Sequence, residues 1–238
     1  MSNGHKNGCA FFIYNKMKKQ ILILMLLVLA ISSHAQKSVT TFLGIPVDGT
    51  KSEMIRKLKS KGFKDCPYIK DGLTGEFNGR EVNITVVTNN NKVYRISVCE
   101  ANSTDETNTK IRFNELCQQF GNNKKYMALA REASDYIIPE DEDIAYNMTV
   151  NKKRYEAAFC QLLTPEEAKS LMLTKYTQEQ IDSFDDETKE EKIKELAESS
   201  IEILKNRIVW FMVSEYLGKY FIALFYDNLY NQANGEDL

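Results

Sequence analysis

The chain has 238 residues, of which 43% are hydrophobic, 27% are charged and 11% are aromatic. This composition is typical of a globular protein and excludes the collagen-like and intrinsically disordered classes. The formal net charge of −2 argues against a nucleic-acid-binding protein, because neutralising phosphates requires an excess of lysine and arginine. We expect one large or two small folded domains and no nucleic-acid partner.

The N-terminal segment has the pattern of a secretory signal peptide. Residues 21–31 form an unbroken apolar run after several lysines, and Ser33 and Ala35 supply the small residues of a cleavage site before Gln36. The run is shorter than a membrane-spanning helix, and no second long apolar run follows it. We expect residues 1–35 to be removed, with Met17 as a natural start of the leader. The mature chain is then periplasmic or secreted, without a transmembrane span.

Removing this leader also removes His5 and His34, which are the only histidines. The mature chain keeps 27 basic and 33 acidic side chains, a net charge of −6. Without imidazole, Ser-His-Asp and Cys-His catalysis and histidine-ligated metal sites are excluded. The sequence also lacks Gly-rich phosphate loops. We therefore expect no cofactor and no enzymatic activity, with hydrolysis by paired carboxylates as the catalytic alternative.

Four cysteines remain in the mature chain: Cys66, Cys99, Cys117 and Cys160. An even number in an exported chain predicts two disulfides, and four cysteines allow three pairings. We favour Cys66–Cys99 and Cys117–Cys160, because each would join a helix end to a strand in its own half of the chain. The alternative is four buried free thiols that pack as small apolar residues.

The first half of the mature chain predicts one helix followed by an antiparallel meander. Residues 39–47 read as a short extended segment. Thr50 and Glu53 form a capping box for a helix over 51–61, which Gly62 ends. Strands follow at 73–77, 82–86 and 94–98, where apolar and polar residues alternate between Asn-rich turns.

The second half repeats this order. The spacing of apolar residues predicts a helix over 105–120 and a short helix near 124–133. Alternation then predicts strands at 146–150 and 155–159. A helical insertion over 164–206 interrupts the pattern, and two apolar strands, 207–215 and 219–227, end it.

The predicted fold class is α+β. Two helix-plus-meander units, 36–101 and 102–238, would form one antiparallel sheet with helices packed on it and a helical insertion. This order resembles the tandem layout of the beta-lactamase inhibitor protein family and the single-unit outer-membrane lipoproteins that assist barrel assembly. The opening phrase Phe42–Gly49 and the tail Tyr226–Leu238 are similar to those of secreted proteins of Gram-negative bacteria. The resemblance implies export and assigns no activity.

The final hairpin is apolar on both faces, so one face must pack on the helices and the other needs a separate explanation. The candidate partner-binding residues are Trp210, Phe211, Phe221 and Phe225, because exposed aromatic side chains supply contact area at low entropic cost. The alternative is that the insertion 164–206 covers the second face as another layer.

Two acidic runs and the polar tail offer oxygen ligands for a cation. The runs 140–143 and 182–187 lack the ligand spacing of an EF-hand loop, so we expect solvated loops and no metal. Asp227, Asn228, Asn231 and Asn234 in the tail are expected to belong to a frayed polar terminus.

These observations predict an exported binding protein that acts on a protein or another envelope macromolecule through a sheet face or the helical insertion. An envelope structural or assembly factor is the alternative. The sequence leaves the oligomeric state and the identity of the partner open.

Overall fold

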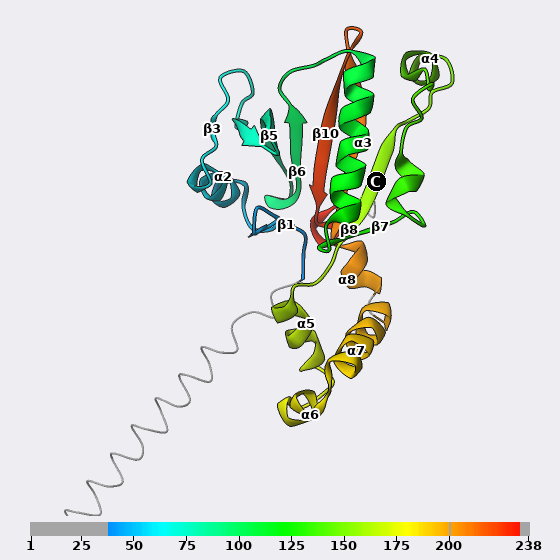
Figure 1. Cartoon of the computed structure of the whole chain (residues 1–238). Coiled ribbons are helices and arrows are strands. Elements are labelled where there is room, and N and C mark those ends of the chain that lie inside the picture. The colour runs from blue at the N-terminus through cyan, green and yellow to red at the C-terminus, as the bar shows by residue number, and fades with distance from the viewer. Residues whose placement is uncertain (1–37, 200, 234–238) are drawn as a thin grey trace, which may run out of the picture. The chain divides into compact units, whose positions relative to one another are not determined.

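The computed structural model describes residues 38–199 and 201–233; the predicted signal peptide lies outside them. An eight-stranded antiparallel sheet has the strand order β3-β4-β5-β6-β10-β9-β8-β7 (Figure 1). Its strands are β3 (Lys64–Asp65), β4 (Leu73–Phe77), β5 (Arg80–Asn89), β6 (Lys92–Glu100), β7 (Tyr126–Ala128), β8 (Glu156–Gln161), β9 (Ile208–Tyr216) and β10 (Lys219–Asp227). A separate small hairpin pairs β1 (Thr41–Phe42) with β2 (Ile45–Pro46). The predicted α+β class is confirmed.

Helices connect and flank these strands. They are α2 (Lys51–Ser60), α3 (Glu106–Asn122), α4 (Ile144–Thr149), α5 (Pro165–Met172), α6 (Gln178–Ser183), α7 (Asp186–Ser199) and α8 (Ile201–Lys205), with short 3₁₀ turns η1 (Ala133–Tyr136) and η2 (Leu229–Asn231). Among the described residues, none of the helices combines the length and the hydropathy that crossing a bilayer requires.

The sheet consists of two meanders that meet in the middle. In the first, α2 precedes β3, β4, β5 and β6; in the second, α3 precedes β7, β8, β9 and β10. The last strands of the two units pair antiparallel, with Ser97 opposite Phe225 and Arg95 opposite Asp227. The two predicted helix-plus-meander units therefore form one continuous sheet.

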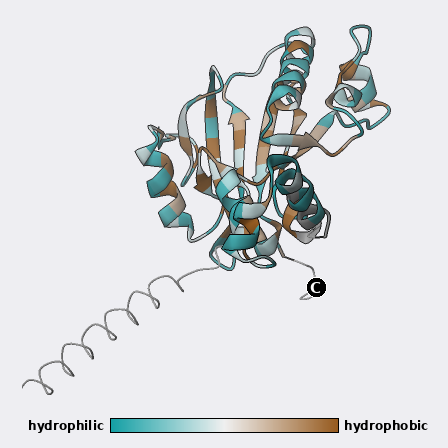
Figure 2. Ribbon diagram, turned by 60° about the horizontal axis from the view of Figure 1, so that its bottom comes forward, coloured by the Kyte–Doolittle hydropathy of each residue, from teal (hydrophilic) through white to brown (hydrophobic). Residues whose placement is uncertain are grey.

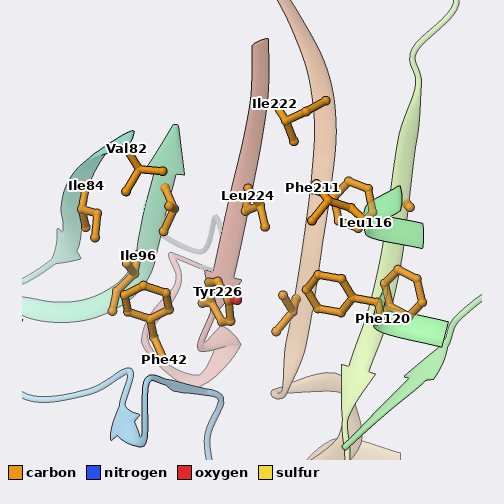
Figure 3. Close-up of a cluster of buried hydrophobic side chains, with 14 of the residues drawn as sticks. Phe42, Val82, Ile84, Ile96, Leu116, Phe120, Phe211, Ile222, Leu224 and Tyr226 are labelled. Carbon is orange, nitrogen blue, oxygen red and sulfur yellow. The ribbon is translucent and has the colours of Figure 1, made fainter. Parts of the chain in front are cut away.

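Both unit helices pack on the same face of this sheet. Helix α2 contacts β5 and β6, and α3 contacts β7, β9 and β10. Apolar residues concentrate along the central strands and the sheet-facing sides of these helices (Figure 2). Leu224 and Tyr226 of β10 lie in the core with Phe42 of the small hairpin and with Phe120 of α3 (Figure 3).

Local sequence signals set the ends of α2 and the tight turns. Thr50 and Glu53 form the predicted capping box at the start of α2. Two-residue turns with positive φ at both positions join β4 to β5 at Asn78-Gly79 and β9 to β10 at Leu217-Gly218. Such turns match the twist of a hairpin and favour Asn-Gly.

Two predicted elements of the second unit are wrong. Residues 124–133 contain strand β7 in place of a helix, and residues 146–150 belong to helix α4 and its end in place of a strand. Asp143 caps α4 by accepting a hydrogen bond from the Tyr146 N–H at 2.7 Å, and Ile144 is the buried anchor. Tyr146 and Val150, which suggested a strand face, are 55% and 56% exposed.

A buried arginine links the helical insertion to the rest of the fold. Arg207, which is 1% exposed, donates from Nη1 to Glu167 Oε1 of α5 and to Ser38 Oγ, both at 2.6 Å. The helices also have a small apolar cluster of their own around Met172 and Ile181. They lie beyond one end of the strands (Figure 1).

Candidate functional site

The sheet face opposite α2 and α3, which we call the open face, differs between the two units. Side chains alternate along strands, so the burial and register of each strand identify the residues on this face. The β4–β6 half carries Thr74, Glu76, Glu81, Asn83, Thr85, Val87, Arg95, Ser97 and Cys99. The β8–β10 half carries Glu156, Ala158, Cys160, Ile208, Trp210, Met212, Ser214, Phe221, Ala223, Phe225 and Asp227. One half is polar, and the other is largely apolar.

A cluster around Trp210 occupies the centre of the open face. The Trp210 and Phe225 rings stack with centroids 4.2 Å apart. The Arg95 guanidinium carbon lies 5.3 Å from the Trp210 ring centroid and 4.9 Å from that of Phe225, within the range of a cation–π interaction. Trp210 Nε1 donates to Asp227 Oδ2 at 2.9 Å. The indole is therefore held in one orientation.

The insertion does not form a second layer over this cluster. Its helix α8 reaches the open face beside β8, where the Cys160 thiol donates to the Leu204 carbonyl oxygen at 3.3 Å and Cys160 is buried. Trp210, Met212 and Phe225 stay partly exposed. The alternative that residues 164–206 cover this face does not hold at these positions, because the insertion packs at the end of the strands.

Three of the four predicted partner-binding residues lie on the open face, and the fourth does not. Trp210, Phe221 and Phe225 are partly exposed there. Phe211 is fully buried and its ring lies 5.1 Å from that of Phe113 on α3. The prediction for Phe211 is wrong because neighbouring residues of a strand point to opposite faces of the sheet.

The tip of the β9–β10 hairpin adds two exposed apolar residues that the sequence analysis missed. Tyr216 is 69% exposed and Leu217 is 83% exposed. Leu217 has a φ of +51°, a left-handed conformation that is unfavourable for a bulky side chain. The signal was the Leu-Gly turn itself, because a leucine stands where the turn geometry favours asparagine.

The predicted disulfides are absent, since all four cysteines are free. Cys66 donates weakly to Asn83 Oδ1 at 3.6 Å, and Cys99 is the neighbour of Asn83 across β5 and β6. The Asn83 side chain therefore separates the first favoured pair. Cys117 of α3 lies in the core on the helix-covered side, whereas Cys160 faces the open side, so the sheet separates the second pair.

Burial also makes three of these thiols poor nucleophiles. Desolvation raises the pKa of Cys117 to about 12 and raises the pKa of Cys99 above its ordinary value. Burial likewise raises the pKa of Cys160, although Arg207 opposes this shift. The thiolate is the reactive form, so these side chains act as packing residues.

The polar tail is built into the fold. Asp227 and Asn228 are buried, and Asn228 Nδ2 donates to the Val47 carbonyl oxygen at 2.8 Å. Asn231 Nδ2 donates to Asp48 Oδ1 and to the Val93 carbonyl oxygen. The expected frayed terminus is therefore wrong for residues 227–231, while Asn234 lies outside the described residues. These amides tie the end of the chain to its N-terminal segment.

The acidic loop 140–143 is held by basic and phenolic groups. Lys110 Nζ donates to the carbonyl oxygens of Glu140 and Glu142. Glu142 also accepts from Lys153 Nζ and from the Tyr155 hydroxyl, both at 2.5 Å. In the part of the chain with assigned structure, no group of three or more Asp, Glu, Cys or His side chains is placed to hold a metal ion.

Comparison of the chain with protein-family models, with curated proteins and with solved structures gives no match. The open face carries a largely apolar surface around Trp210, whose indole is held by Phe225 and Asp227.

Proposed function

We propose that this chain is an exported, non-enzymatic binding protein whose apolar half of the open face docks a protein partner. The observation that carries the proposal is the contrast within one sheet. Its open face is polar in the first unit, as a solvated face should be, and apolar around Trp210, Met212 and Phe225 in the second. A contiguous apolar patch on a folded protein is a common mark of an interaction surface.

Pre-organisation supports the same conclusion. Trp210 is fixed by the Phe225 ring and by its hydrogen bond to Asp227. An aromatic anchor that is already ordered loses little conformational entropy on binding. Tyr216 and Leu217 extend this surface to the hairpin tip. The exposed Leu217 there has a strained, left-handed backbone conformation.

Two acidic residues on the open face indicate which charge the partner carries beside its apolar contact. Glu76 and Glu81 lie directly opposite each other on β4 and β5, and both are exposed. Like charges in such a pair destabilise a sheet. The proposed partner therefore presents apolar side chains to Trp210 and basic side chains to this acidic corner.

Site-specific photo-crosslinking tests the proposal. Benzoylphenylalanine is placed at Met212, at Leu217 or, as the control, at Thr85 on the polar half, in cells that export the chain. We expect the same protein to be crosslinked from positions 212 and 217 and not from 85, and the product to be lost when Trp210→Ala is added. Equal crosslinking from Thr85, or none from Met212 and Leu217, would refute the proposal.

A further inference from the structure

A groove with a volume of about 610 Å³ lies between the small β1–β2 hairpin, the end of α3 and the core side of β10, and Glu76 at the edge of the open face contributes to its rim. Its lining comes from the segment around Leu43, from Lys61 and Phe63 after α2, from the end of α3 and from Tyr126 of β7. Leu224 and Tyr226 of β10 contribute to its floor. This volume lies within the range of pockets that hold small molecules or short peptide segments.

The groove has an apolar floor and a neutral polar rim. Phe63, Phe120 and Tyr226 are buried at its base, and the Phe120 and Tyr126 rings lie 4.7 Å apart. The exposed rim contains one cation, Lys61, and one anion, Glu76. Its charges therefore cancel, and the lining favours a neutral ligand with an apolar group.

Two rim amides present the hydrogen-bonding pattern that matches a peptide group. Asn78 Nδ2 donates to Gln119 Oε1 at 2.8 Å. Within residues 38–199 and 201–233, Asn78 Oδ1 and Gln119 Nε2 have no further protein partner. One acceptor and one donor on this pair of exposed amides are thus available to a ligand, and a peptide group offers the complementary N–H and C=O.

Leu43 gives an independent indication that the groove is used. It is 41% exposed at the first position of a tight turn and has a φ of +51°. Asparagine or glycine would relieve this strain. The left-handed backbone at Leu43 lowers the stability of the fold, while its side chain adds an apolar contact to the groove. Backbone strain of this kind is often found at binding sites.

We propose that this groove binds a short extended peptide segment carrying a large apolar side chain. The side chain fills the aromatic floor beside Leu43, and one peptide group pairs with Asn78 Oδ1 and Gln119 Nε2. The apolar floor of the groove lies on the other side of the sheet from Trp210, and the proposal does not depend on the function proposed above, although Glu76 borders both surfaces.

Titration of the full mature chain, labelled with ¹⁵N, tests the groove. The probe is N-acetyl-Leu-Phe-Leu-methylamide, and the readout is the side-chain amide signals of Asn78 and Gln119. We expect saturable shifts with a Kd of about 0.1–1 mM, and none with the matching triglycine peptide or with maltotriose. Absent shifts, equal shifts with triglycine, or saturable shifts with maltotriose would overturn the proposal. Shifts that instead follow protein concentration without peptide would assign the groove to a second copy and also overturn it.

Matched variants separate recognition from folding. Gln119→Ala should raise the Kd for the peptide at least about tenfold, whereas Gln118→Ala on the same helix should leave this Kd unchanged. Leu43→Asn should raise both the melting temperature of the protein and the Kd for the peptide. A leucine with a purely structural role would not give this combination. Equal Kd values for the two glutamine variants, or tighter binding by Leu43→Asn, would contradict the proposed contacts.

Discussion

Arg95 and Asp227 form a bidentate ion pair between β6 and β10, the two strands at which the two units meet. Arg95 Nε lies 2.6 Å from Asp227 Oδ1 and Arg95 Nη2 lies 2.7 Å from Oδ2. The ion pair joins β6 to β10, and Asp227 Oδ2 also accepts a hydrogen bond from the Trp210 N–H. One carboxylate therefore reinforces the backbone pairing between the two halves of the sheet and orients the central aromatic residue of the open face.

Replacing Asp227 should destabilise the protein strongly. Asp227→Ala leaves Arg95 and the Trp210 N–H without their acceptor, and the Asp227 side chain is only 6% exposed. We expect a loss of about 3 kcal/mol in the free energy of unfolding, measured by urea denaturation. Asp65→Ala, which breaks the exposed pair with Lys59, should cost less than about 1 kcal/mol. Similar losses for the two variants would contradict the structural role of the ion pair between Arg95 and Asp227.

Trp210 and Phe211 are neighbours in sequence, but their replacement should have different effects because they lie on opposite faces of the sheet. Phe211→Ala creates a cavity against Phe113 and Phe159 and should cost about 4 kcal/mol of stability. Trp210→Ala removes a partly exposed ring and should cost about 2 kcal/mol while abolishing crosslinking from Met212. Denaturation curves and crosslinking yields measure both effects. A larger stability loss for Trp210 than for Phe211 would show that the faces are assigned wrongly.

The free thiols give a chemical test of the cysteine environments. We expect the mature protein, purified without reductant, to show four thiols per chain after unfolding in guanidinium. Native protein should react slowly, because burial raises the pKa values of Cys99, Cys117 and Cys160. Titration with a thiol reagent and peptide mapping measure this. Two or fewer thiols in the unfolded chain would restore the disulfide prediction.

Docking of the insertion should depend on pH. Burial pushes the pKa of Glu167 upward, but hydrogen bonds from Arg207 and the Thr164 backbone outweigh it, so this pKa lies below its ordinary value of 4.5. The stabilisation is complete above the ordinary value and is lost as pH falls through the lowered pKa. Hydrogen exchange in α5–α7 should therefore accelerate at acid pH.

Neighbouring glutamates provide the control for this pH dependence. Glu167→Gln should show fast exchange in α5–α7 at neutral pH, because it loses the charge that pairs with Arg207. Glu166→Gln, at an exposed position of the same helix, should behave as the wild type. An unchanged exchange rate in Glu167→Gln would rule out this ion pair as the anchor.

Local signals in the sequence were sufficient for most of the first unit. Thr50 and Glu53 determine the start of α2, and alternation at 82–86 and 94–98 determines β5 and β6. The short strands β3 and β7 were not predicted, because two or three residues are too few to show the alternation of apolar and polar residues. Residues 146–150 were misassigned because alternation over five residues competes with the Asp143 cap, which decides the structure.

The candidate site was predicted only in part for a similar reason. The two-sided apolar pattern of the last hairpin identified Trp210, Phe221 and Phe225 as candidates, but it could not say which face the helices cover. Disulfide pairing failed because cysteine spacing contains no information on which side of the sheet a thiol lies. The ion pair between Arg95 and Asp227 joins residues 132 positions apart, and no local pattern signals it.

The most direct test of the docking surface is the affinity for the purified crosslinked partner, measured by calorimetry with wild type, Trp210→Ala and Thr85→Ala. Trp210 is proposed as the central anchor, so its loss should weaken binding about 30-fold or more, whereas Thr85→Ala should change the Kd by less than about threefold. A folded Trp210→Ala variant that binds the partner as tightly as wild type would contradict the account.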